Sequence, residues 1–66
     1  MHTGVIVFYL PAKGYGYLRL EGTREEFHFR AKHLHCRVQA GDLVRFRLRQ
    51  GRQGHFADEI VLAGLT

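Results

Sequence analysis

Closely spaced glycines constrain the fold of this 66-residue chain more than any other feature. The segments between them are short and rich in β-branched and aromatic residues. No window keeps an apolar period of 3.6 for the length of an ordinary helix. Short strands separated by turns are typical of a small barrel or sandwich, so we expect one all-β domain over residues 1–66. The glycines are Gly4, Gly14, Gly16, Gly22, Gly41, Gly51, Gly54 and Gly64.

Five segments have the composition of strands, and residues 31–40 are irregular, with one short helical turn expected near Ala31 to Leu34. The last but one segment alternates most clearly, with Val44, Phe46 and Leu48 on one face and arginines on the other. Five strands in this length favour a closed antiparallel barrel, which leaves no free sheet edge. The strands are expected over Val5–Leu10, Tyr15–Leu20, Glu25–Arg30, Leu43–Arg49 and His55–Leu62.

The charge favours a polyanionic partner. Ten Lys and Arg against six Asp and Glu give a net charge of +4, and nine of the ten cations follow residue 18. A small basic protein is attracted to nucleic acid, although the same charge also serves solubility. The single cysteine, Cys36, excludes an internal disulfide, and no apolar run approaches the ~20 residues of a membrane span. We therefore expect a cytoplasmic protein with no signal peptide and no membrane partner.

The second predicted strand carries the residues most suggestive of a binding surface. Tyr15 and Tyr17 are two apart and share one face, whereas Gly16 and Leu18 share the other. If Leu18 faces the core, the two tyrosines face outward side by side. Core packing of these rings is the alternative, and the flanking glycines make it less favoured.

Other rings and a cation extend this surface. Phe27 and Phe29 share a face of the third strand, Phe8 adds a ring from the first strand, and Lys13 lies in the first turn. Rings on adjoining strands form a platform on which unpaired bases stack, at about 1–3 kcal/mol per base. Two alternatives stay open: Phe8 is buried in place of Tyr9, or Phe27 and Phe29 are buried and the intervening histidine faces outward.

The segment Lys13–Leu18 reads Lys-Gly-Tyr-Gly-Tyr-Leu and resembles the first ribonucleoprotein motif of the bacterial cold-shock domain family. Gly4 has the family's spacing to Lys13, Gly41–Phe46 resembles the family's Gly-x-x-Val-x-Phe, and Gly51–Ile60 resembles its last hairpin. The resemblance implies a five-stranded antiparallel OB-fold barrel that binds single-stranded RNA or DNA. Such a protein acts as an RNA chaperone or as a regulator of transcription or translation.

The chain departs from the family on its first and third strands. Val7–Leu10 replaces Lys-Trp-Phe-Asn, so Phe8 can still stack but a lysine and an asparagine are missing. The family's second motif, Val-Phe-Val-His and an aromatic, corresponds to Glu26–Arg30 in two registers. The ungapped one places Phe29 at the motif histidine; a one-residue slip places His28 there and Glu25 inside the barrel. We prefer the ungapped register because burying an unpaired carboxylate is costly.

The loop after the third strand is shorter than the family's and lacks its aromatic, and Arg30, Lys32 and Arg37 are expected to offset that loss by contacting phosphates. Arg45, Arg47 and Arg49 are interpreted as a solvated strand face away from the rings. The predicted nucleic-acid-binding residues are Phe8, Lys13, Tyr15, Tyr17, Phe27, Phe29 and Arg30.

Enzymatic and metal functions have little support. His33, His35 and Cys36 lack the paired spacing of a structural zinc site, so we expect no metal and no cofactor. The chain has no serine, and Asp58 and Glu59, adjacent on a strand, are expected to point to opposite faces. We therefore predict no catalytic residues and no small-molecule substrate.

The alternative function is a protein-interaction or dimer-forming OB barrel that has lost nucleic-acid binding. It is motivated by the apolar first strand, where Val5 and Val7 stand at positions that are often lysines in the family. A monomer or weak homodimer is expected. Stacking does not read the 2′-hydroxyl, so the sequence does not distinguish RNA from DNA.

Overall fold

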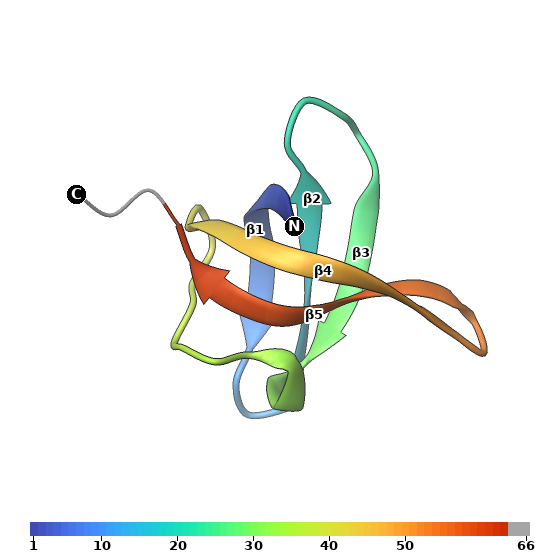
Figure 1. Ribbon diagram of the computed structural model, residues 1–66. Helices are drawn as coiled ribbons and strands as arrows, with labels where there is room; N and C mark the ends of the chain where they lie inside the picture. The colour runs from blue at the N-terminus through green and yellow to red at the C-terminus, as the bar shows by residue number, and fades with distance from the viewer. Residues whose placement is uncertain (64–66) are drawn as a thin grey trace.

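A computed structural model describes residues 1–63 of the chain as five strands that close into a barrel (Figure 1). The strand order around the barrel is β1-β2-β3-β5-β4, and β4 pairs back with β1. This arrangement confirms the predicted all-β, five-stranded OB-type barrel. The elements are β1 (His2–Leu10), β2 (Tyr15–Leu20), β3 (Glu26–Arg30), the 3₁₀ turn η1 (Ala31–His33), β4 (Leu43–Gly51) and β5 (Gly54–Leu62).

Closure of the barrel differs from the expectation in two details. β3 and β5 pair in parallel, through His28 and Phe56, whereas every other neighbouring pair is antiparallel. β1 begins at His2, three residues earlier than predicted, because residues 2–5 pair with β4. The only helical element within residues 1–63 is η1, and none there is long and apolar enough to cross a membrane.

The core is filled by apolar side chains from all five strands, and Val38 from the loop before β4 adds to it. Gly16 lies beside this core: a Cβ there would stand 2.3 Å from the carbonyl oxygen of Phe8 and 2.8 Å from the ring of Phe29. Glycine at this position is therefore what lets the Phe29 ring pack against β2. The buried residues are Ile6, Leu18, Phe29, Val38, Val44, Phe46, Ala57 and Ile60.

A bulge in β1 sets which of its rings faces outward. Ile6 pairs with Leu18, but Phe8 pairs with Tyr17, so β1 contains one more residue than β2 between these pairs. The extra residue reverses the alternation: Ile6 is buried, while Phe8 lies against rings of the outer face. Tyr9 packs against the core. The preferred prediction that Phe8 faces outward is confirmed.

The prediction that Phe27 and Phe29 face outward is wrong. Phe29 is fully buried, and Phe27 packs against the core with its ring centroid 6.3 Å from that of Phe46. β3 begins at Glu26, which leaves Glu25 exposed in the preceding turn. The cost of burying Glu25, which favoured the ungapped register, therefore does not arise. The alternative with His28 outside is the one observed.

A second bulge, in β5, overturns the expectation that Asp58 and Glu59 point to opposite faces. Arg45 pairs with Val61 but Arg47 pairs with Asp58, and Glu59 has a φ of 48°. With the alternation interrupted in this way, both carboxylates reach the same side of the hairpin.

Candidate nucleic-acid interface

Four aromatic side chains from three strands meet on the outer surface of the barrel. Phe8 comes from β1, Tyr15 and Tyr17 from β2, and His28 from β3; we call them the ring cluster. Tyr17 lies 5.4 Å from Phe8 and 5.5 Å from His28, and Tyr15 lies 6.2 Å and 6.0 Å from the same two rings, measured between centroids. Each ring therefore contacts two others and all four are half-buried.

This geometry holds the rings in place while leaving part of each exposed. Centroid separations of 4.5–7 Å are those at which aromatic pairs attract one another, here in edge-on, tilted and stacked arrangements. A surface of pre-positioned rings can take further flat π-systems without first losing side-chain freedom. Such a surface is chemically suited to unpaired bases.

His28 belongs to the ring cluster but is absent from the set of binding residues predicted from the sequence. It pairs with Tyr17 across β2 and β3, and Arg30 pairs with Tyr15. A signal was present in the sequence, because Glu26, His28 and Arg30 alternate with two phenylalanines as polar and apolar residues do in a half-buried strand.

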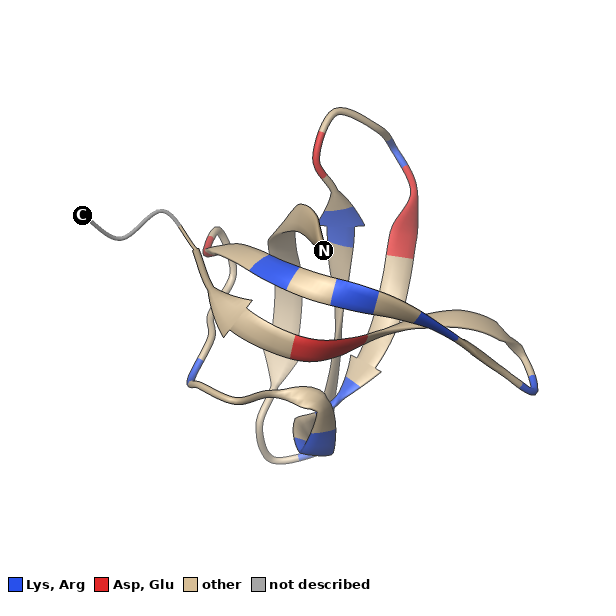
Figure 2. Cartoon of the chain, in the orientation of Figure 1, with Lys and Arg blue, Asp and Glu red and all other residues tan. Residues whose placement is uncertain are grey.

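Cations border the ring cluster on one side. Lys13 in the β1–β2 turn, Arg30 at the end of β3 and Lys32 in η1 are all exposed, and none forms an ion pair within residues 1–63. Figure 2 shows the basic positions at the end of β3 and in η1 next to each other. Five of the seven predicted residues thus lie at this surface: Phe8, Lys13, Tyr15, Tyr17 and Arg30.

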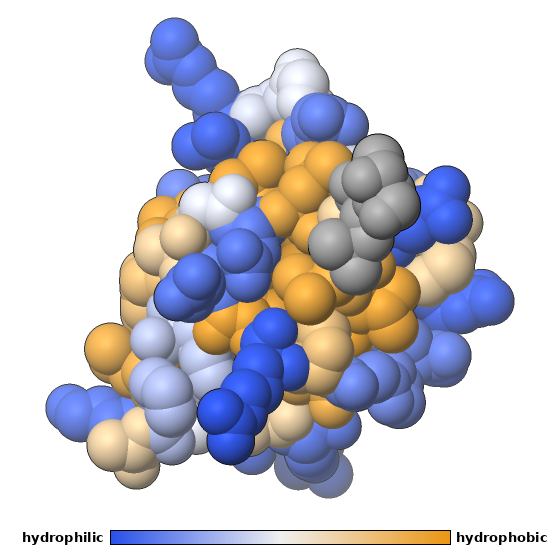
Figure 3. Space-filling view, turned by 90° about the vertical axis from the view of Figure 1, so that its left-hand side faces the viewer, coloured by the Kyte–Doolittle hydropathy of each residue, from blue (hydrophilic) through white to orange (hydrophobic). Residues whose placement is uncertain are grey.

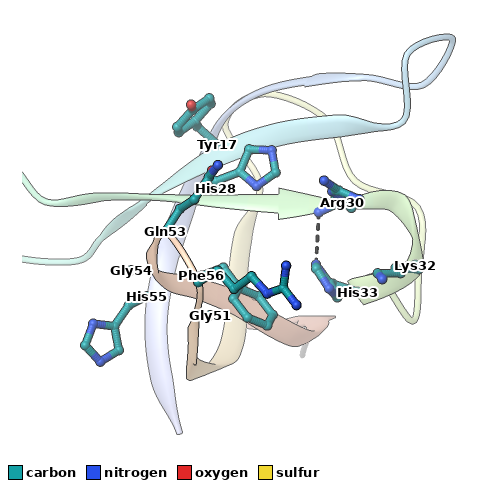
Figure 4. A pocket seen from close by; sticks show the side chains of 11 residues that line it. Tyr17, His28, Arg30, Lys32, His33, Gly51, Gln53, Gly54, His55 and Phe56 are labelled. Atoms are coloured by element: carbon teal, nitrogen blue, oxygen red, sulfur yellow. Dashed lines mark hydrogen bonds between the residues drawn. The ribbon is translucent and has the colours of Figure 1, made fainter.

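A groove of about 680 Å³ continues from the ring cluster to the β4–β5 hairpin (Figure 4). Its lining contains three cationic side chains and three histidines, and no carboxylate among the described residues. The groove is therefore electropositive along its length. Its lining residues are Tyr17, His28, Arg30, Lys32, His33, Gly51, Arg52, Gln53, Gly54, His55 and Phe56.

His33 is held in one orientation in this groove. The backbone N–H of Arg30 donates to His33 Nδ1 over 3.0 Å, and the imidazole stacks on Phe56 with centroids 4.8 Å apart and planes 27° apart. Burial lowers the pKa of His33 below its ordinary value of 6.5; Asp58 opposes this shift, and the charges of Lys32 and Arg30 add to it. At neutral pH the ring is therefore uncharged, with its proton on Nε2 because Nδ1 accepts a hydrogen bond.

The arginines of β4 lie on a different surface and are partly neutralised. Arg49 donates to Asp58 over 2.6 Å and to Glu59 over 2.5 Å, and Arg47 lies 3.6 Å from Glu59. Burial acts to raise the pKa of Asp58, but hydrogen bonds from the Glu59 backbone N–H and from Arg49 hold it below its ordinary value of 3.8. Figure 2 shows the basic positions of β4 beside the acidic positions of β5.

Apolar surface gathers on another side of the barrel. Figure 3 shows hydrophobic atoms over much of the face that lies at the left of Figure 1. A separate hollow of about 630 Å³ is lined by Tyr9, Pro11, Ala31, Leu34, Cys36, Arg37 and Val38. Cys36 is a free thiol, and within residues 1–63 no three His, Cys, Asp or Glu side chains are grouped so as to hold a metal ion. The exposed large apolar side chains are Met1, Val7, Leu10 and Leu62.

No protein-family model and no curated protein matches the chain. The function therefore has to be inferred from the chemistry of these surfaces.

Proposed function

We propose that this barrel binds single-stranded nucleic acid, stacking bases on the ring cluster and holding phosphates with neighbouring cations. The observation that carries the proposal is the set of four rings on an outer face, each in contact with two others, beside cations that have no carboxylate partner within residues 1–63. Exposed rings and free cations together are what single-strand binding surfaces combine. The likeness of Lys13–Leu18 to the cold-shock motif supports the same function.

Each group has a distinct role in this proposal. Tyr15 and Tyr17 offer flat surfaces for successive bases, and Phe8 and His28 flank them. Lys13 and Arg30 contact phosphates and supply attraction that does not depend on sequence. Because a duplex hides its base faces, such a protein binds transcripts in their unpaired state and acts as an RNA chaperone or as a regulator of transcription or translation.

The primary test is a titration with a fluorescent oligothymidine at low salt. We expect a dissociation constant in the micromolar range or tighter, weakening as salt rises. Tyr17→Ala is expected to weaken binding about 5- to 150-fold, which corresponds to the loss of about 1–3 kcal/mol of stacking for one base. A parent protein that binds no oligonucleotide at low salt contradicts the proposal.

A matched pair of histidine variants tests where the surface lies. His28→Ala removes a ring of the ring cluster. His2→Ala removes a ring outside the cluster, because His2 lies at the start of β1 and packs on Phe46. We expect weaker binding only for the first. Equal binding by Tyr15→Ala, His28→Ala and the parent would place the interface elsewhere.

A second candidate function, a protein-interaction or dimer-forming barrel, is supported by the apolar side. Val7, Leu10 and Leu62 are each exposed by more than a third, and exposed apolar surface often marks a protein contact. Sedimentation at two protein concentrations, with and without oligonucleotide, separates the candidates. A dimer that excludes the oligonucleotide favours this second function, and a monomer that binds it favours the first.

A further inference from the structure

The groove beside the ring cluster has a second pair of aromatic rings on its far wall. His33 from η1 stacks on Phe56 from β5, with 4.8 Å between the centroids. The parallel pairing of β3 and β5 joins Phe56 to His28, so this pair lies next to the ring cluster across one strand boundary. Two separate aromatic surfaces therefore line the same groove, as Figure 4 shows.

Neither ring of this pair is buried in the core. Phe56 is half-buried, and a Cβ added to Gly51 would stand 3.2 Å from its ring, so Phe56 packs closely on the hairpin backbone. His33 is half-buried as well, and its Nδ1 is occupied by the Arg30 N–H. Both rings are held in place while the groove remains open beside them.

The charges around the pair favour a phosphate backbone. Arg30 and Lys32 lie on the η1 side, Arg52 lies in the hairpin turn, and no carboxylate lines the groove within the described chain. The nearest acidic group on β5, Asp58, is already hydrogen-bonded to Arg49. Among residues 1–63, the side chains that line the groove are therefore cationic or neutral, and the nearby Asp58 is paired with Arg49.

We propose that His33 and Phe56 form a second stacking site, which takes a base further along a single strand already held by the ring cluster. The proposal rests on the nucleic-acid function proposed above and assigns it a second contact. Arg52, in the hairpin turn that lines the same groove, contacts a phosphate beside the second site. Because His33 Nδ1 accepts a hydrogen bond from the Arg30 N–H, the imidazole carries its proton on Nε2. This Nε2–H donates to an oxygen of the base or of the nucleic-acid backbone.

Strand length distinguishes one stacking site from two. A strand of three nucleotides has bases enough for the ring cluster alone, whereas a strand of eight nucleotides has bases for both sites, within the roughly 4–16 nucleotides that an OB fold covers. Contacts at His33 and Phe56 therefore strengthen the binding of long strands and leave that of short strands unchanged.

The experiment titrates oligothymidines of three and eight nucleotides into the parent, Tyr17→Ala and Phe56→Leu proteins. Leucine keeps apolar packing at position 56 and removes the ring. We expect Phe56→Leu to weaken octamer binding about fivefold or more and to leave trimer binding unchanged, whereas Tyr17→Ala weakens both. Unchanged octamer binding by Phe56→Leu overturns the second site alone. Unchanged binding of both strands by both variants overturns the proposed function as well.

An exposed arginine provides a variant that leaves the fold intact. Arg52→Gln is compared with Arg24→Gln, which makes the same charge change in the exposed β2–β3 turn, outside the groove. The salt slope is the slope of log K for the octamer against log salt concentration. We expect Arg52→Gln to reduce the magnitude of this slope by about one and Arg24→Gln to leave it unchanged. Equal slopes for the two variants contradict the proposed path, and thermal unfolding of each variant confirms that it is folded.

Discussion

The outer surface of β1–β2–β3 and that of the β4–β5 hairpin are both rich in polar and charged groups, but they differ in how those groups are satisfied. On the hairpin, Arg49 binds Asp58 and Glu59. On the three-stranded side, Lys13 and Arg30 have no carboxylate partner within residues 1–63. Arg47 and Arg49 are thus partly neutralised by acidic residues, whereas the cations beside the ring cluster remain free to bind a ligand.

The same contrast applies to apolar groups. The rings of the cluster contact one another at the surface, whereas the inward side chains of the same strands fill the core. We infer that the outer rings contribute mainly to binding and the inner ones mainly to folding. The predictions below test that separation.

The largest expected effect comes from two neighbours on β3 that face opposite ways. Phe29→Ala empties a fully buried site and is expected to cost about 3–5 kcal/mol of unfolding free energy. That is a large part of the total for a domain of this size, at roughly 0.05–0.15 kcal/mol per residue. His28→Ala is expected to cost less than about 1 kcal/mol. Urea unfolding followed by circular dichroism measures both, and similar losses would remove the distinction between the two faces.

The next prediction compares cations of the two surfaces. Arg30→Gln removes a free cation beside Tyr15, and Arg47→Gln removes one that lies 3.6 Å from Glu59. We expect the first to weaken oligonucleotide binding severalfold and to reduce the salt dependence by about one ion. The second should change neither, since it lies on the other surface. A reduced slope for Arg47→Gln would mean that the hairpin arginines also contact the ligand.

Local patterns were enough to predict the strands and the outward tyrosines. Gly16 between Tyr15 and Tyr17 restricts the inward face, and the same pattern places Leu18 in the core. The outward face of β2 could be predicted from the sequence because it depends only on residues within that strand.

The bulges and the face of β3 depended on information beyond a single strand. The extra residue in β1, next to Phe8, is defined only by its pairing with β2, and the one in β5, at Glu59, only by its pairing with β4. The choice between Phe29 and His28 turned on whether Glu25 lies in the strand or in the turn. The groove joins His33 and Phe56, which are distant in the sequence and are brought together by the β3–β5 pairing.

Acid unfolding gives the smallest expected effect and assigns a separate pH range to each surface. Because burial lowers the pKa of His33, the unfolded chain binds this proton more tightly, and stability falls as the pH drops below 6.5. For Asp58, burial acts to raise the pKa, but hydrogen bonds from the Glu59 N–H and from Arg49 outweigh it and leave the pKa below 3.8. The stability that the ionised Asp58 contributes is therefore lost as the pH drops below 3.8. The stability contributed by His33 should therefore be lost at a higher pH than the stability contributed by Asp58.

Urea midpoints at pH 7.5, 5.5 and 3.0 measure these losses in the parent and in two variants. His33→Gln is expected to reduce the loss between pH 7.5 and 5.5, because glutamine does not titrate. Asp58→Asn is expected to reduce the loss between pH 5.5 and 3.0. Because the Asp58 charge raises the pKa of His33, this variant should also slightly increase the loss between pH 7.5 and 5.5. If His33→Gln instead changes only the lower range, the imidazole is not held neutral by its burial against Phe56. Such a result would leave the Nε2–H donor of the second stacking site without support, because that donor requires a neutral ring whose Nδ1 accepts from Arg30.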